Sequence, residues 1–447
     1  AGVLSLTLAL IIFLLADLIA AWLWSDPALV APLRVATVVI FSYGLYATWI
    51  GVANGLKRFK QQALFDMTFA TLKVSAIIGA VLLGAGVTGI FVSFSAVAVF
   101  MACLACAVIY LPLKDRKSES SDGSFMGTRK ALAYMGSIMG SFLAMNILLQ
   151  GDVVLLKGFL HEASMRLVGA GEEGWKASAL QAWYPSGTGL DALALAREAS
   201  SAVTGIYAGT RNITMIPYQG IIPLTFVVFP VLSAASFRGD SGESARLVGG
   251  AIRFAILLVS LLCGGLVLSE DFVLTLLFGT HYGAGEVFLV PMVMGTLSFA
   301  LYVVLTSMLT AAGFPALVML IGLSAALIHL GLLTGAAQLG ELPFERAVYI
   351  AWASALGPLS GVVLAVWMLF RKLAISFPWL SLFRTLASTA GVTWLVLYLI
   401  PLEGILGLGL RFVLYLSMIL VSWVLVGELR RAEAQQLRRF LGRKVKP

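Results

Sequence analysis

The dominant pattern in this chain is a succession of long apolar stretches separated by short polar ones. Each stretch has about 20 residues, the length that an α-helix needs to cross the hydrocarbon core of a bilayer. The pattern predicts an all-α polytopic membrane protein with about twelve transmembrane helices. The expected spans are 3–24, 33–53, 65–85, 89–112, 131–156, 203–233, 248–268, 285–309, 314–338, 347–369, 379–400 and 405–426.

Composition supports this pattern and removes a competing interpretation. The chain of 447 residues is 60% hydrophobic and only 12% charged, whereas soluble domains carry about 25% charged residues. In a soluble protein the net charge of +8 would favour nucleic-acid binding. Here the basic residues gather in one set of loops, so we expect no nucleic-acid partner.

The distribution of Lys and Arg predicts the orientation in the membrane. Basic clusters belong to loops that follow even-numbered spans, namely LKRFK at 56–60, LKDRK at 113–117, FRK at 370–372 and the tail at 430–446. The positive-inside rule places these loops in the cytoplasm. We therefore expect a multi-pass protein of the cell inner (cytoplasmic) membrane whose C-terminus is cytoplasmic, with its basic tail on anionic headgroups.

Two long polar segments suggest how the chain is divided. Residues 113–130 are rich in Ser and in charged residues, which predicts a cytoplasmic linker between two lobes. The first lobe then comprises residues 1–112 with four spans, and the second comprises 131–369 with six. Residues 161–202 form an external insertion in the second lobe, and 370–447 hold an extra helix pair and the tail.

The stretch from 131 to 230 contains the least typical membrane helices. Its first apolar helix carries Asp152 near the far end, and its second carries Arg211, followed by Pro217, Pro223 and Pro230. A charge in a membrane helix is costly and usually faces a bundle interior or a water-filled cavity. Prolines there free backbone carbonyls that neighbours or water must satisfy. This hairpin predicts a cavity through which a polar molecule passes.

No motif for a cofactor or for ATP hydrolysis is found in the sequence. Cys103 and Cys106 have C-x-x-C spacing but lie within an apolar span, where packing is expected rather than a redox or metal site. The chain has no G-x-x-x-x-G-K-[ST], H-E-x-x-H or G-x-S-x-G motif. We expect a transporter driven by an ion gradient or membrane potential, with no cofactor and no enzymatic activity.

Several motifs resemble those of one transporter family. Within 276–313, L-F-G-x-x-Y precedes a span, a Pro lies early in that span, and A-A-G ends it. The same pattern fits NGLKRFKQQALFDM at 54–67, LLQGDVVLLKGFL at 148–160 and TGIYAGTRNITMIPYQGIIPLTFVVFPVLS at 204–233. Together these segments resemble the polysaccharide-biosynthesis flippases of the MOP (multidrug/oligosaccharidyl-lipid/polysaccharide) superfamily.

The resemblance implies a fold of two pseudo-repeated lobes plus a C-terminal helix pair, with the first two helices of the family lacking in this chain. A faint repeat agrees with it, because A-N-G-L-K at 53–57 and A-A-G-F-P at 311–315 follow corresponding spans. The implied function is translocation of a polyprenyl-(pyro)phosphate-linked oligosaccharide by alternating access, for surface polysaccharide biosynthesis. The implied partners are the lipid-linked oligosaccharide, membrane lipids, H+ or Na+ as coupling ion, and polysaccharide polymerase machinery.

The anionic headgroup of such a substrate needs fixed positive charge to cross hydrocarbon. For this role we expect Lys73 and Arg211, because Arg binds phosphate as a planar fork and Lys as a point charge. The polar side chains expected to face the sugars, or to link helices by hydrogen bonds, are Asn146, Asn212 and Gln219.

The remaining polar groups inside spans are candidates for ion coupling. Asp152 and Asp17 are expected to bind a proton or cation, and His329 to titrate near neutral pH. The alternative for the acids is structural, in which they pair with Arg211 and Lys73. A lone His in an apolar helix can likewise bond a neighbouring carbonyl.

Two other functions are compatible with the pattern. A membrane-embedded glycosyltransferase, polymerase or ligase acting on lipid-linked sugars would use the external insertion, although its acids lack metal-ligand spacing. These groups are His161, Glu162, Arg166, Glu172, Glu173 and Asp191. A drug/cation antiporter of the same fold would favour acids and aromatic residues over the pair of Lys73 and Arg211.

Overall fold

The computed structural model describes residues 2–56, 58–110, 128–169, 192–238, 241–269, 272–373, 377–400 and 404–428. All regular secondary structure in these ranges is helical. The chain divides into two compact units, Ala1–Phe125 and Met126–Pro447, and each is described by itself. Most of the expected linker and the whole basic tail lie outside the described residues.

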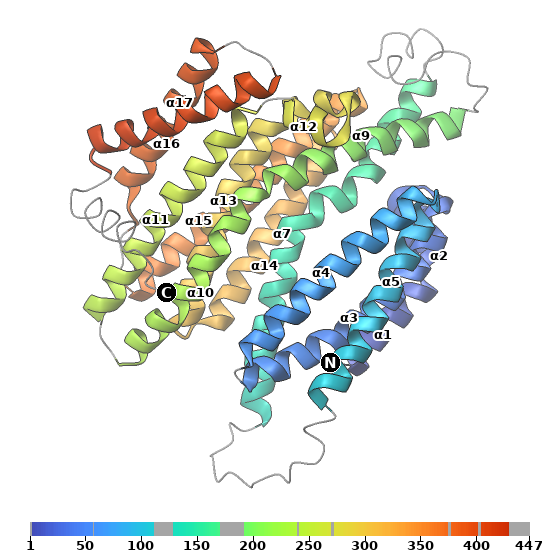
Figure 1. The fold of residues 1–447 in the computed structure, drawn as a ribbon, viewed down its shortest axis with the longest axis horizontal. Helices are drawn as coiled ribbons and strands as arrows, with labels where there is room; N and C mark the ends of the chain where they lie inside the picture. The colour runs from blue at the N-terminus through green and yellow to red at the C-terminus, as the bar shows by residue number, and fades with distance from the viewer. Residues whose placement is uncertain are drawn as a thin grey trace. The chain divides into compact units, whose positions relative to one another are not determined.

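The amino-terminal unit is a bundle of membrane-length helices. Its elements are α1 (Gly2–Leu14), α2 (Ala16–Trp24), η1 (Pro27–Leu29), α3 (Val30–Gly55), α4 (Phe59–Leu82), α5 (Gly86–Ala105) and the π-helical turn η2 (Cys106–Tyr110). Figure 1 shows α3, α4 and α5 packed side by side. Their shared core contains Tyr46, Phe65, Phe69 and Met101.

The carboxyl-terminal unit is a larger bundle organised around α13. Its elements are α7 (Thr128–Gly169), α9 (Ala192–Thr214), α10 (Ile216–Phe237), α11 (Ser241–Val267), α12 (Phe272–Phe278), η4 (Thr280–Gly285), α13 (Glu286–Ala311), α14 (Pro315–Ala336), α15 (Pro343–Leu373), α16 (Trp379–Leu399) and α17 (Gly404–Leu425). Most residues of α13 are buried, because α9, α10, α11, α14 and α15 all contact it. Outer helices such as α17 expose large apolar side chains, which suits contact with lipid.

The expected number of spans is confirmed. Ten helices in the described part of the chain are long and apolar enough to cross a membrane, or up to twelve if each of two bent pairs counts as one span. The first bent pair is α1 with α2, at 64°, and corresponds to the expected span 3–24. The second runs through residues 196–236, with a bend of 42°, and includes the expected span 203–233.

Prolines explain why the second of these spans is interrupted. Pro217 has no N–H to donate to the carbonyl of Ile213, and the helix breaks at Met215, between α9 and α10. Pro230 likewise removes the bond to the carbonyl of Phe226, the residue at which the 42° bend occurs. The chain therefore turns where its backbone ladder is interrupted.

The helix α7 is much longer than a membrane crossing. Its 42 residues extend roughly 60 Å at 1.5 Å per residue, against about 30 Å of hydrocarbon. The expected external insertion at 161–202 therefore begins and ends in helix, since α7 reaches Gly169 and α9 starts at Ala192. The centre of the insertion, residues 170–191, lies outside the described residues.

A buried arginine fixes this long helix to its neighbours. Arg346, in the first turn of α15, is only 1% exposed. Its guanidinium donates to the backbone carbonyls of Phe159 in α7, at 3.0 Å, and of Gly340, at 3.2 Å. Gly340 has φ of +80°, and its missing side chain leaves room for the backbone of Arg346. The arginine thus links α7 to the turn between α14 and α15.

Replacement of Arg346 by Leu is expected to lower stability by about 2–4 kcal/mol, because two partly buried carbonyls lose their charged donor. Thermal unfolding of the purified protein in detergent should show a clearly lower midpoint. Arg371→Leu, at an exposed position in the last turn of α15, serves as the control. Equal midpoints for the two variants would contradict a stabilising role of Arg346.

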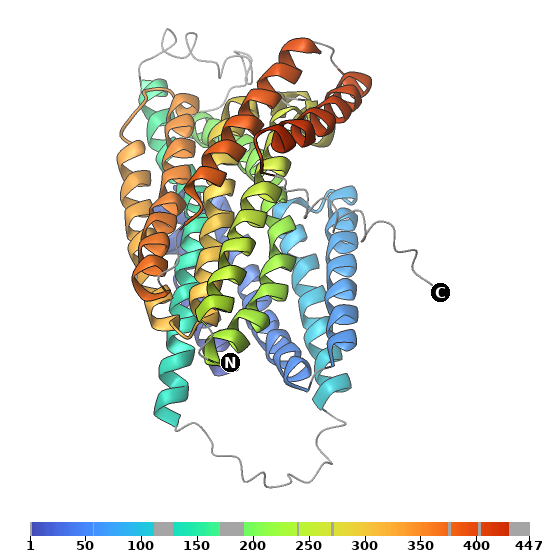
Figure 2. The same cartoon turned by 90° about the vertical axis from the view of Figure 1, so that its left-hand side faces the viewer.

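The last two helices are attached to the bundle by charged groups. Figure 2 shows α16 lying along α11. At one end, Arg253 of α11 forms an ion pair with Glu428, with 3.4 Å between Nε and Oε2, and the Ser381 hydroxyl donates to the same carboxylate. Elsewhere, Arg411 of α17 donates to the carbonyls of Ile400 and Leu268. The sequence places Arg253 and Arg411 near the ends of spans; the structure places Arg253 in the middle of α11, and both arginines have structural partners.

Candidate functional site

The strongest candidate site is a buried ion pair in the carboxyl-terminal unit. Asp152 of α7 and Arg211 of α9 lie 3.1 Å apart between Oδ2 and Nε. Their side chains are 0% and 6% exposed. Burial of two charges is expensive, and their mutual attraction offsets this cost only when the geometry is good. The structural alternative considered from sequence, pairing of Arg211 with Asp152, is therefore realised in this conformation.

Neighbouring groups complete part of the hydrogen bonding of this pair. The Tyr207 hydroxyl donates to Asp152 Oδ2 at 2.9 Å, and Arg211 donates to the carbonyl of Leu149 at 3.0 Å. Tyr207 lies four residues before Arg211, so both side chains emerge on the same face of α9. Asp152 Oδ1 is buried and has no partner among the described residues. One carboxylate oxygen thus remains open to a proton or a cation.

A histidine with unused nitrogens lies against the same cluster. His329 of α14 is 0% exposed, and neither ring nitrogen has a hydrogen-bond partner in the described part of the chain. Gly357 makes room for the ring, because a Cβ there would lie 2.1 Å from Nδ1, whereas a Cβ at Gly151 would lie 3.6 Å from Nε2, at ordinary contact distance. Gly151 directly precedes Asp152, so the imidazole packs beside the acid. The expected carbonyl partner of this histidine is not found in the described residues.

Asp17 and Lys73, the charged candidates of the amino-terminal unit, do not pair with each other. Asp17 pairs with Arg34, with 2.6 Å between Oδ2 and the guanidinium, and the guanidinium also lies over the ring of Phe13. Lys73 does not pair with Asp17; its ammonium lies 5.7 Å from the centre of the Phe94 ring. Such a cation–π contact leaves the donors of Lys73 available for another anion. The pairing alternative for Lys73 is therefore wrong for this conformation.

The three amides expected to face sugars are exposed. Asn146 donates to the carbonyl of Phe142, one turn earlier in α7, at 2.8 Å. Asn212 and Gln219 are exposed on α9 and α10. The structure thus groups Asp152, Arg211 and His329 in one cluster and leaves the amides outside it. Sequence reasoning missed Tyr207, although its four-residue spacing from Arg211 was a usable signal.

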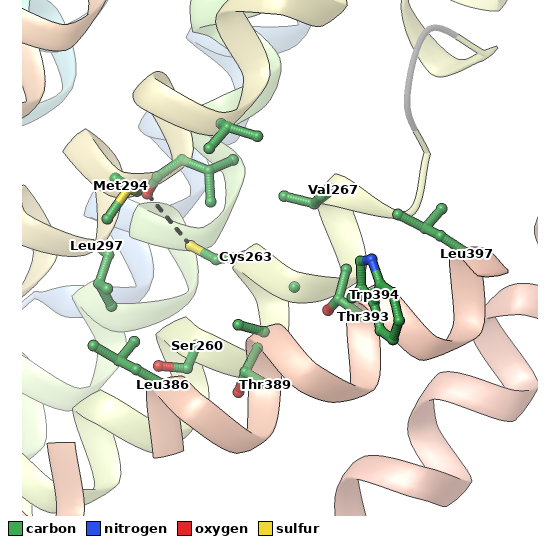
Figure 3. A pocket seen from close by; sticks show the side chains of 14 residues that line it. Ser260, Cys263, Val267, Met294, Leu297, Leu386, Thr389, Thr393, Trp394 and Leu397 are labelled. Carbon is green, nitrogen blue, oxygen red and sulfur yellow. Dashed lines mark hydrogen bonds between the residues drawn. The ribbon is translucent and has the colours of Figure 1, made fainter. Parts of the chain in front are cut away.

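The carboxyl-terminal unit also contains an apolar cavity of about 410 Å³. It lies between α11, α13 and α16, and Figure 3 shows Cys263, Met294, Leu297, Leu386 and Trp394 around it. The Cys263 thiol donates to the carbonyl of Val293. No charged residue lines the cavity, and apart from the three hydroxyl residues Ser260, Thr389 and Thr393 its lining is apolar, which suits contact with hydrocarbon.

No group of three or more His, Cys, Asp or Glu side chains that could hold a metal ion occurs among the described residues. Cys103 and Cys106 are free thiols. The groups that the structure brings together at the candidate site are the carboxylate of Asp152, the guanidinium of Arg211, the hydroxyl of Tyr207 and the imidazole of His329.

Comparisons with known proteins agree with this architecture. Residues 1–175 match the sequence model of a family described as polysaccharide biosynthesis protein, whereas no curated protein matches the chain. The fold is similar to that of the lipid II flippase MurJ in an inward closed conformation, with a TM-score of 0.63 and 13% identity, covering 96% of this chain and 82% of that one.

Two structures of a MATE protein are also similar. The structure in complex with MaL6 has 15% sequence identity to this chain, and the structure in a straight conformation has 16%. Each alignment has a TM-score of 0.51 and covers 83% of this chain and 78% of the MATE chain. The fold of this chain is thus similar to the folds of the lipid II flippase MurJ and of the MATE protein. The resemblance to the MOP superfamily is confirmed by a polysaccharide-biosynthesis match over residues 1–175 and by a MurJ- and MATE-like fold.

Proposed function

We propose that the chain is a flippase that moves a polyprenyl-(pyro)phosphate-linked oligosaccharide across the cytoplasmic membrane by alternating access, for surface polysaccharide biosynthesis. The observation that carries this proposal is the buried pair of Arg211 and Asp152 in a chain with a flippase-like fold. An arginine inside a membrane bundle is a strong phosphate ligand once its carboxylate partner is removed. The multi-pass architecture and the polysaccharide-biosynthesis match of residues 1–175 support the same substrate class.

The geometry suggests how binding and ion coupling are linked. In this conformation the guanidinium of Arg211 is paired with the carboxylate of Asp152. Binding of H+ or Na+ at the open Oδ1 of Asp152 neutralises the acid and weakens its hold on Arg211. The substrate phosphate then takes the place of the carboxylate. Release of the ion reverses the exchange and expels the phosphate, so the two ligands are coupled through one arginine.

His329 is the proposed proton carrier of this cluster. Its ring lies near Gly151, which directly precedes Asp152, and both of its ring nitrogens are without partners among the described residues. A neutral imidazole can accept a proton and pass it to a neighbouring carboxylate. In the amino-terminal unit, Lys73 is proposed as a second headgroup contact and Asp17 as a second ion site. The exposed amides Asn146, Asn212 and Gln219 remain candidates for contacts with sugars.

The apolar cavity between α11, α13 and α16 supports a substrate with a lipid tail. Its walls offer hydrocarbon contact over about 410 Å³ without a charged group. An amphiphile with a phosphate headgroup therefore finds both kinds of environment within the carboxyl-terminal unit. A drug/cation antiporter, the alternative function of the same fold, has less support, because the buried acid is already neutralised by Arg211.

The proposal is tested by reconstitution. Purified protein in proteoliposomes should move a fluorescent lipid-linked oligosaccharide to the opposite leaflet, measured as loss of accessibility to an external quencher. An ion gradient of H+ or Na+ should speed the movement. A rate equal to that of protein-free vesicles, with correctly folded protein present, would overturn the proposed function.

In the same assay, Lys73→Gln is expected to slow flipping about tenfold, because loss of a charged contact to phosphate removes about 1.4 kcal/mol or more. Lys73→Arg should retain most of the activity. Lys372→Gln, at an exposed position in the last turn of α15, is the matched control and should behave like the parent. Unchanged flipping by Lys73→Gln would remove this residue from the site.

A further inference from the structure

A second cavity in the carboxyl-terminal unit has a different lining from the apolar one. Its volume is about 290 Å³, and it lies between α7, α10, α13 and α14. No charged residue lines it, and nearly half of its lining residues carry a hydroxyl group. These residues are Tyr134, Ser141, Tyr302, Thr306, Ser307 and Thr310.

The hydroxyl groups of this cavity have hydrogen-bonding capacity to spare. Ser141, Thr306 and Thr310 donate to carbonyls of their own helices, one turn earlier, so their oxygen lone pairs remain free. Tyr302 and Ser307 make no hydrogen bond through their hydroxyls within the described residues. Tyr302 is nevertheless only 2% exposed, and its hydroxyl lies close to Gly322 of α14.

This lining excludes several ligands. A hydrocarbon chain would leave the hydroxyls of Tyr302 and Ser307 without partners, at a cost of about 1–3 kcal/mol each. A phosphate or a metal ion would find no charged group to neutralise it. A neutral sugar ring, by contrast, offers many hydroxyl donors and acceptors and an apolar C–H face for Phe142 and Phe229.

We propose that this hydroxyl-lined cavity binds a neutral sugar ring of the transported glycolipid; the inference rests on the proposed flippase function. Its position fits that role. Met145 of the cavity and Asp152 of the ion pair are seven residues apart on α7 and share a face of the helix. They are separated by roughly 10 Å along the helix axis, which is the reach of a short oligosaccharide from its phosphate.

The test measures how much the sugar adds to binding. The probes are farnesyl diphosphate and farnesyl diphosphate carrying neutral hexose or N-acetylhexosamine di- and trisaccharides, titrated against the full chain in nanodiscs. At least one glycosylated probe should bind the parent about tenfold more tightly than farnesyl diphosphate. Tyr302→Phe combined with Thr306→Val removes two hydroxyls at nearly constant volume, and should reduce this gain to about twofold or less.

A matched variant controls for indirect effects. Thr296→Val lies in the same helix, α13, and removes a buried hydroxyl that also donates one turn back, but Thr296 does not line the cavity. It should keep the full gain. If no sugar on any probe improves binding to the parent, or if the double variant keeps the gain, the sugar site is overturned while the proposed function stands. If farnesyl diphosphate itself does not bind, the proposed function and the site that rests on it both fail.

Discussion

Replacement of Arg211 by Gln is expected to reduce flipping by at least about a hundredfold and to destabilise the protein by about 3–5 kcal/mol. Both effects have the same origin. Asp152 is fully buried, so loss of its partner leaves an uncompensated carboxylate in the bundle, whose remaining hydrogen bond among the described residues comes from Tyr207. Flipping is measured in proteoliposomes, and stability is measured as the midpoint of thermal unfolding in detergent.

A double variant separates the structural effect from the functional one. Asp152→Asn with Arg211→Gln replaces two buried charges by two neutral amides, and should regain most of the lost stability. Flipping should remain at least about a hundredfold slower, because no guanidinium is left for the phosphate. Recovery of transport by the double variant would show that the pair is purely structural.

Arg166→Gln, which breaks an exposed ion pair with Glu162 on the same α7 helix, is the stability control and should cost at most about 0.5 kcal/mol.

The overall fold could be predicted because the membrane imposes it. A span must be predominantly apolar over about 20 residues, so the sequence alone predicts about twelve spans, and the described residues contain ten, or up to twelve with the two bent pairs. The interruption of the 203–233 span was also visible, since Pro217 and Pro230 cannot donate to the helix ladder. The extension of α7 to Gly169 could not be predicted, because a polar helix beyond the membrane has no hydrophobic signal.

The site was only partly predictable. Charge in an apolar helix identified Asp152 and Arg211, since such residues are rarely tolerated without a role. Their pairing was one of two open alternatives. The partner of Asp17 was missed, because Arg34 lies at the start of the next span and the two meet only when the hairpin closes. The hydroxyl-lined cavity was out of reach, since it combines side chains from four helices.

The surroundings of His329 illustrate the same limit. Many glycines occur in the spans, and small residues in membrane helices are common. Nothing in the sequence distinguishes Gly357 from the others. Only the packed structure shows that the space which a side chain at Gly357 would fill is taken by His329. A glycine that is essential for packing and one that is incidental therefore look alike until the helices are assembled.

Gly357→Ala is accordingly expected to destabilise the protein by about 1–3 kcal/mol and to slow flipping at least tenfold. The added Cβ would lie 2.1 Å from Nδ1, 2.6 Å from Cγ and 2.7 Å from Cβ of His329. These are atoms at the base of the side chain, so a rotation of the ring does not relieve the clash. The other edge of the ring lies near Gly151, which directly precedes Asp152, and a Cβ at Gly151 would be 3.6 Å from Nε2. The expected displacement would therefore disturb the ion pair as well.

The sign of this effect is informative, because Gly→Ala in a helix normally stabilises by about 1 kcal/mol. Gly331→Ala, at a position of α14 with nothing within 4 Å of the added Cβ, should show that ordinary gain in the same thermal assay. Combining Gly357→Ala with His329→Ala removes the clash and should restore stability. If this double variant flips without any response to an imposed proton gradient, His329 is the proton carrier; if the response is that of the parent, the histidine only fills space. Stability of the single Gly357→Ala variant equal to that of Gly331→Ala would contradict the packing on which both interpretations depend.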